Sequence, residues 1–246
     1  FNTLGSVNKL DSTVGYSFNQ HFEIDAGVPF YMVSASNSTT GAQSGAGLGD
    51  VYLDLVFRAP KTVSYTGDMR VTVPTGSTSS GLSTGRATIF FNNHIERAFS
   101  HWTPFVDFGI GNSVQDSMLY TRPFSSLGAV ADLDGGASYR FTKFVALGGS
   151  LYGVVPMGEQ KVYSKLLGKG VSGGSVAHGR VFDANGLSSG TGITQDYGAS
   201  TWLAVTPNRF LVLQAGYTRS VSYALNTFSF GVGTNLGAWR RATTRQ

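Results

Sequence analysis

The most constraining feature of this chain is an alternation of polar and apolar side chains that continues for about ten residues at a time. In residues 50–58, the apolar residues Val51, Leu53, Leu55 and Phe57 alternate with mostly polar ones. Successive side chains of a strand point to opposite faces, so this period predicts strands with one apolar and one polar face. Eleven segments show the pattern, and we expect strands at residues 10–19, 21–34, 49–59, 62–75, 85–99, 102–114, 127–141, 144–156, 195–207, 209–222 and 226–238.

The length of these strands and the spacing of their connections indicate a membrane barrel. Strands of soluble proteins average about five or six residues, whereas about 9 to 11 tilted residues cross the hydrocarbon core of a bilayer. Short turns, mostly flanked by aromatic residues, alternate with long Gly/Ser/Thr-rich loops, which we expect to be external, at residues 35–48, 76–84, 115–126 and 157–194. The predicted fold class is therefore all-β, with residues 1–246 forming a single transmembrane antiparallel β-barrel domain.

The direction of the first strand predicts a barrel of about 12 strands. If the short turns face the periplasm, the strand at 10–19 runs inward from the outside. An even-stranded barrel with both ends in the periplasm then needs one more strand before it. We expect residues 1–9 to be the outer end of that strand or the loop that follows it.

Composition excludes several other classes of protein. Mean hydropathy is -0.01, and no uninterrupted apolar run of about 18 residues occurs, which excludes an ordinary transmembrane helix. The chain has no cysteine, and its four histidines show no ligand spacing, so we expect no metal and no cofactor. Basic residues are scattered between segments, so we do not expect nucleic-acid binding.

The polar face of the strands carries carboxylates and arginines but almost no lysine. A soluble β-sandwich also alternates, with its apolar face inward, but its solvent face more often carries lysine. Short carboxylates and arginines favour a confined aqueous lumen, in which acids outnumber arginines and cations should pass more readily than anions. The predicted pore-lining residues are Asp54, Asp68, Arg70, Arg86, His94, Glu96, Asp107, Asp132, Asp134 and Arg140.

A two-residue turn at 100–101 fixes the register of one hairpin. It pairs Glu96 with Phe105 and His94 with Asp107, and all four residues fall on the polar face. A His–Asp pair is two-thirds of a hydrolase triad, but no nearby serine on this face offers a nucleophile. We therefore interpret the pair as structural or pore-lining and expect no catalytic residue; a barrel hydrolase that uses His94 and Asp107 is the alternative.

Three short motifs carry a resemblance to a known family. The segments "GVPFY" at 27–31, "GLGDVYLDLVFR" at 47–58 and "VTVPTGS" at 71–77 resemble the outer-membrane channels of the phenol-degradation MetA-pathway type. The resemblance implies a roughly twelve-stranded outer-membrane barrel that passes small molecules, hydrophobic or aromatic ones among them.

Together these observations predict a porin-like channel of a bacterial outer membrane, without enzymatic activity. About twelve strands should leave a narrow lumen, and residues 157–194 should fold over or into its mouth. The expected partners are outer-membrane lipid, lipopolysaccharide and small solutes, and a homo-oligomer or a larger membrane complex is compatible with such a barrel. A plugged structural or docking barrel is the remaining alternative.

Overall fold

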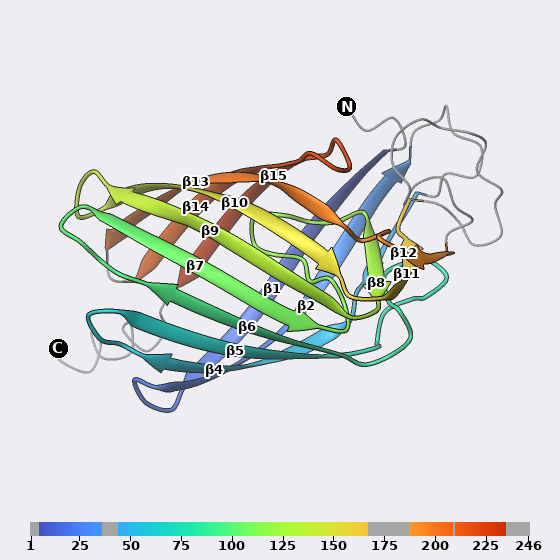
Figure 1. Ribbon diagram of the computed structural model, residues 1–246, viewed down its shortest axis with the longest axis horizontal. Coiled ribbons are helices and arrows are strands. Elements are labelled where there is room, and N and C mark those ends of the chain that lie inside the picture. The colour runs from blue at the N-terminus through green and yellow to red at the C-terminus, as the bar shows by residue number, and fades with distance from the viewer. Residues whose placement is uncertain (1–4, 36–43, 167–186, 209, 235–246) are drawn as a thin grey trace.

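Eleven long antiparallel strands form the wall of the molecule, as the sequence predicts. The computed structural model describes residues 5–35, 44–166, 187–208 and 210–234, and these contain no helix. No described helix, accordingly, has the length and hydropathy needed to cross a membrane. The wall strands, shown in Figure 1, are β1 (Gly5–Ser17), β2 (Phe22–Ala35), β4 (Val51–Ala59), β5 (Ser64–Val73), β6 (Thr88–Glu96), β7 (Trp102–Gly111), β9 (Val130–Arg140), β10 (Val145–Pro156), β13 (Asp196–Asn208), β14 (Leu211–Ser220) and β15 (Asn226–Thr234).

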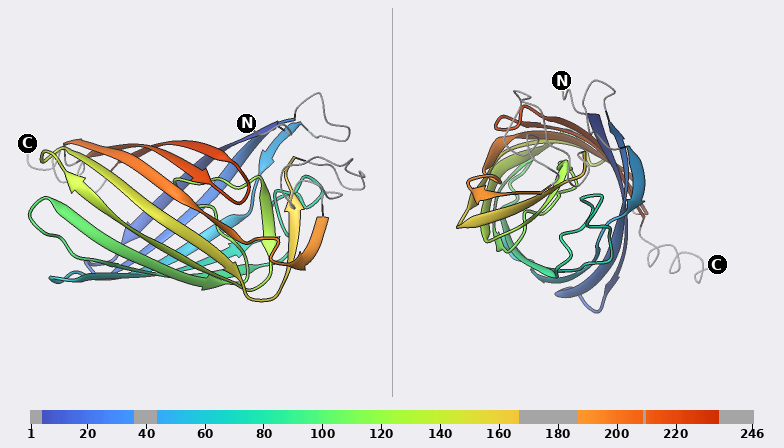
Figure 2. Two further views of the ribbon diagram at one scale, coloured as in Figure 1. Left: turned by 45° about the horizontal axis from the view of Figure 1, so that its top comes forward. Right: turned by 90° about the vertical axis from the view of Figure 1, so that its right-hand side faces the viewer.

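The wall strands follow one another in chain order, each antiparallel to the next. This sheet curls into the shape of a barrel, with the tight turns at one end and the longer connections at the other (Figure 2). Because direction alternates along eleven strands, the two edge strands β1 and β15 run the same way. No pairing joins β1 to β15 within the described residues. A twelfth strand between them, antiparallel to both, remains a prediction.

The structure differs from the sequence-based boundaries at the start of the chain and in the loops. Residues 5–9 do not belong to a preceding strand or loop, because Gly5 to Lys9 continue β1 in unbroken register with residues 31–35 of β2. Four short strands lie within or at the edge of segments expected to be loops, where runs of four to six residues give too weak an alternation to be recognised. They are β3 (Gly45–Leu48), β8 (Phe124–Leu127), β11 (Glu159–Ser164) and β12 (Leu187–Thr191).

Strand β3 pairs with β2, whereas β12, β11 and β8 form a separate three-stranded sheet at the end with the long connections (Figure 1). The predicted loops at 35–48 and 157–194 and the predicted strand end at 226–238 lie partly outside the described residues.

Burial is inverted with respect to a soluble protein. Along β4, Val51, Leu53 and Leu55 are exposed on the outside of the sheet, whereas Tyr52 and Asp54 between them are buried on the inside. The same outward face elsewhere exposes further large apolar side chains, up to 87% for Phe230. A β-sandwich would bury these side chains, so this exterior suits the hydrocarbon of a membrane.

Aromatic side chains gather at the tight turns. Across the β6–β7 turn, Phe99 and Trp102 stack with ring centroids 5.1 Å apart, and the rings of Phe22 and Phe57 approach to 5.3 Å. Amphipathic and aromatic rings of this kind are typical of the interface between hydrocarbon and headgroups. The turn end of the barrel therefore has the girdle that the sequence predicts.

Candidate functional site: a constriction in the lumen

The connection between β7 and β8 leaves the wall and passes through the interior of the curled sheet (Figure 2). We call residues 112–123 the crossing loop. Its Leu119 carbonyl accepts a hydrogen bond of 2.9 Å from Thr218 on β14, and the ring of its Tyr120 lies 5.7 Å from that of Tyr152 on β10. Because the crossing loop contacts strands on the opposite wall, it narrows the lumen near the end with the long connections.

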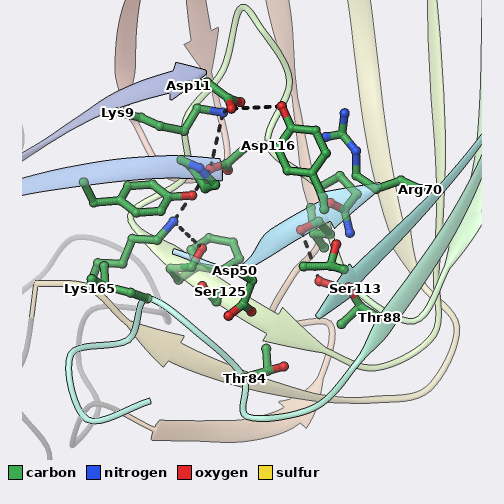
Figure 3. Close-up of a pocket in the computed structure, with 18 residues that line it drawn as sticks. Lys9, Asp11, Asp50, Arg70, Thr84, Thr88, Ser113, Asp116, Ser125 and Lys165 are labelled. Carbon is green, nitrogen blue, oxygen red and sulfur yellow. Dashed lines mark hydrogen bonds and ion pairs between the residues drawn. The ribbon is translucent and has the colours of Figure 1, made fainter. Parts of the chain in front are cut away.

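Asp116 anchors the crossing loop to two further parts of the molecule (Figure 3). Its carboxylate lies 3.9 Å from Nζ of Lys9 on β1 and 3.7 Å from Nζ of Lys165, which follows β11. The Tyr31 hydroxyl on β2 donates to it at 3.1 Å, and the backbone N–H of Arg122 donates at 2.9 Å. One carboxylate thus holds the loop, the wall and the segment after β11 together.

The electrostatics of this anchor favour the ionised carboxylate. Burial acts to raise the pKa of Asp116, but the positive charges of Lys165 and Lys9 outweigh it, so the pKa is lower than usual. Burial lowers the pKa of the Lys165 ammonium, although the Asp116 carboxylate opposes that shift. Lys165 also donates to the carbonyls of Arg122 at 2.8 Å and Phe124 at 3.2 Å.

A cavity of about 80 Å³ lies beside this anchor, between the crossing loop and the wall (Figure 3). Asp11 in its lining accepts a hydrogen bond of 2.9 Å from the Tyr52 hydroxyl and lies 3.3 Å from Lys9. Hydroxyl groups of Thr88 and Ser113 add to the lining. The space beside the crossing loop is therefore polar and of mixed charge.

The loop between β5 and β6 also turns inward at this end. Its residues Leu82 and Thr84 are buried and line the same cavity. At Gly81 the backbone has a φ of +66°, and a Cβ there would meet the Ser164 carbonyl oxygen. Only glycine fits this close approach, which packs the loop against β11. The short sheet of β8, β11 and β12 and this loop thus close around the constriction.

Most of the predicted pore-lining residues lie on the inward face of the wall, and Arg70 among them also lines the cavity beside the anchor. Arg70 donates two hydrogen bonds of 2.6 Å to Asp54, whose exposure is only 5%. Asp68 lies on the same face of β5 as Arg70. Asp132 and Asp134 lie on the inward face of β9, where Asp134 pairs with Asp107 across the strands.

Two predicted lining residues lie at the margins of the wall. Arg86 precedes β6 and is exposed, and Arg140 is the last residue of β9 and is exposed at the turn end. That the whole set lines a conducting path remains a prediction.

The predicted hairpin register is confirmed: His94 pairs with Asp107 and Glu96 with Phe105. Nδ1 of His94 lies 2.8 Å from an Asp107 oxygen, and its Nε2 lies 3.5 Å from Glu96. Among the described residues no hydroxyl group is hydrogen-bonded to His94. Both ring nitrogens face carboxylates, so this imidazole has no nucleophile to activate.

The sequence does not signal the residues that build the constriction. Asp116 and Arg122 occur in a segment that composition marks as an external loop, and Lys165 occurs in another. A lone charged residue in such a loop normally faces water, and nothing in the local pattern shows that these three face inward. Lys9 likewise lies outside the first strand that the sequence predicts, at residues 10–19.

Comparison with known proteins bears on the fold. No family model matches the chain, and no curated protein matches it by sequence. Among solved structures, the crystal structure of an outer membrane channel from Pseudomonas putida F1 superposes with a TM-score of 0.57 at 12% identity, over 93% of this chain and 81% of that one. The chain shares the fold of that outer membrane channel. At this identity the likeness shows the fold alone.

Proposed function

We propose that the protein is an outer-membrane channel through which small solutes diffuse along a narrow acidic lumen, with cations passing more readily than anions. The observation that carries the proposal is the inverted wall, which is apolar outside and charged inside. Its shared fold with a channel from P. putida F1 supports the same function. Its motifs resemble those of channels for aromatic compounds. Small aromatic molecules are therefore among the solutes that should be tested.

The narrowness follows from the strand number and from the crossing loop. About eight strands enclose only packed side chains, and sixteen or more enclose an open channel, so eleven or twelve fall between. The crossing loop then divides this space, since Tyr120 and Arg122 are buried within it. Solutes would pass the remaining polar space, and the size of that space would set the limit on what diffuses.

The charge preference follows from the inward carboxylates. Among the described residues Asp68 and Asp134 form no ion pair, whereas Asp107 contacts the His94 imidazole at 2.8 Å. Asp54, in contrast, is neutralised by Arg70. Unpaired carboxylates along a confined path attract cations and repel anions.

Conductance of the purified, detergent-extracted protein in a planar lipid bilayer, under a potassium chloride gradient, tests the proposal. We expect small discrete steps and a reversal potential that shows potassium preference. A folded and membrane-inserted protein that gives no current would reject the channel and favour a plugged structural barrel. A current that prefers chloride would reject the acidic lumen.

A further inference from the structure

Three aromatic side chains meet on the inward face of the wall, on the turn side of the constriction. The rings of His94 on β6 and Phe105 on β7 stack with centroids 5.6 Å apart. The ring of Trp202 on β13 lies 5.9 Å from that of Phe105. All three residues are half-buried. We call these three residues the aromatic strip.

The aromatic strip exists because the strands between its members have no side chains in the way. Strands β9 and β10 separate β7 from β13, and there Gly136 pairs with Phe105 and Gly148 pairs with Trp202. A Cβ at Gly148 would lie 2.2 Å from Cζ2 of the Trp202 ring. The indole therefore lies over the Gly148 backbone and reaches towards Phe105, which places aromatic surface on the inner wall.

Carboxylates border the aromatic strip. Glu96 is the cross-strand neighbour of Phe105. Asp107 lies two residues after Phe105, on the same face of β7. Asp107 in turn pairs with Asp134, whose Oδ1 is buried and has no hydrogen-bond partner among the described residues. His94 holds Asp107, but the Glu96 side chain is 41% exposed and contacts His94 only at 3.5 Å, so an accessible carboxylate lies beside the ring faces.

This combination selects for one class of solute. An ammonium group is attracted both to the face of an aromatic ring and to a carboxylate, and its organic substituent can stack on the same rings. An inorganic cation gains little from the rings, an aromatic anion is repelled by the carboxylates, and a neutral ring gains nothing from the charge. We propose that the aromatic strip is a binding site within the lumen for organic ammonium ions that carry an aromatic group.

This inference rests on the proposed channel function, and it is tested by block of the potassium current with benzyltrimethylammonium. We expect concentration-dependent block in the unmodified protein, and much weaker block by benzyl alcohol and by benzenesulfonate at the same concentrations. The variant Trp202→Leu retains an apolar side chain but has no ring, and it should weaken the block by about 2- to 30-fold.

Two further variants separate the aromatic strip from general effects on the barrel. Gly148→Ala leaves Trp202 in the sequence but displaces its indole, so it should weaken the block in the same direction. Trp102→Leu removes an exposed ring from the outer girdle and should leave the block unchanged. Circular dichroism and resistance of the chain to unfolding in detergent show whether each variant is folded.

The outcomes distinguish this inference from the channel itself. A cation-selective current that Trp202→Leu leaves equally sensitive to benzyltrimethylammonium would overturn the inference and leave the channel function standing. Equal block by benzyl alcohol would also overturn it, because stacking alone would then account for binding. If the protein conducts no current, equilibrium dialysis of benzyltrimethylammonium against the detergent-solubilised protein and Trp202→Leu decides: a loss of affinity in the variant supports the site, and equal affinity rejects it.

Discussion

Replacing Asp116 with asparagine should release the crossing loop from its inward position. The substitution keeps the size of the side chain but removes the only carboxylate that forms an ion pair with Lys165 among the described residues. The Lys165 side chain is only 2% exposed, so its charge would be left buried without compensation. Breaking a buried ion pair in this way costs about 3–5 kcal/mol.

The consequence for the channel follows from this magnitude. An inward position occupied 99% of the time is favoured by only about 2.7 kcal/mol over the alternative. A loss of about 3–5 kcal/mol therefore reverses such an equilibrium, and Asp116→Asn should show a larger single-channel conductance than the unmodified protein. The matched control is Glu159→Gln, which removes one carboxylate from an exposed residue at the start of β11 and should have little effect on conductance.

The same anchor predicts how conductance depends on pH. Burial acts to raise the pKa of Asp116, but the charges of Lys165 and Lys9 lower it by more than burial raises it. The pKa of Asp116 in the folded protein therefore lies below that in the unfolded chain. The stabilisation is therefore complete above the ordinary aspartate pKa of about 3.9 and is lost as pH falls through the lower folded value. The contribution of this anchor to the conductance should therefore be constant above about pH 4 and be lost only in stronger acid. An Asp116→Asn channel with unchanged conductance would refute the role of this anchor.

Three further predictions concern the inward face. Arg70→Ala leaves the buried Asp54 carboxylate unpaired and should lower the free energy of unfolding by about 3–5 kcal/mol, measured by urea titration in detergent micelles; an unchanged midpoint would contradict the buried pair. Converting both Asp107 and Asp134 to asparagine should move the potassium-to-chloride permeability ratio towards one, and an unaltered reversal potential would show that these carboxylates do not set it. His94→Ala should lower the free energy of unfolding by about 1–3 kcal/mol because Asp107 loses its partner. We expect lipid and peptide hydrolysis to be the same for the variant and the unmodified protein, and a hydrolytic activity that the variant loses would instead establish an enzyme.

The wall could be predicted from the sequence because its physics is local. A strand between lipid and an aqueous interior must alternate, and an apolar residue followed by a polar one, as in Leu53 and Asp54, recurs in most wall strands. Register was predictable where the turn was short, since two residues at 100–101 leave one pairing of His94 that keeps polar residues on one face.

The constriction could not be predicted in the same way because its contacts join distant segments. Asp116 meets Lys9, Tyr31 and Lys165, and none of these lies near it in sequence. A polar loop has the same composition whether it extends into water or folds inward. The aromatic strip was missed for a related reason: Trp202 reaches Phe105 only because glycines occupy the intervening strands, and that depends on the order of the strands.

The anchor of the crossing loop also has a consequence for biogenesis. Its charged groups come from β1, from the β7–β8 connection and from the segment after β11, so it can assemble only when both halves of the chain are in place. Contacts between segments so far apart in sequence form late in folding. A barrel inserted without this anchor would have a wider passage, and the narrowing of that passage would mark the completion of assembly. We expect that a cell in which this step is slow would show a transiently leaky envelope even when the amount of mature protein is unchanged.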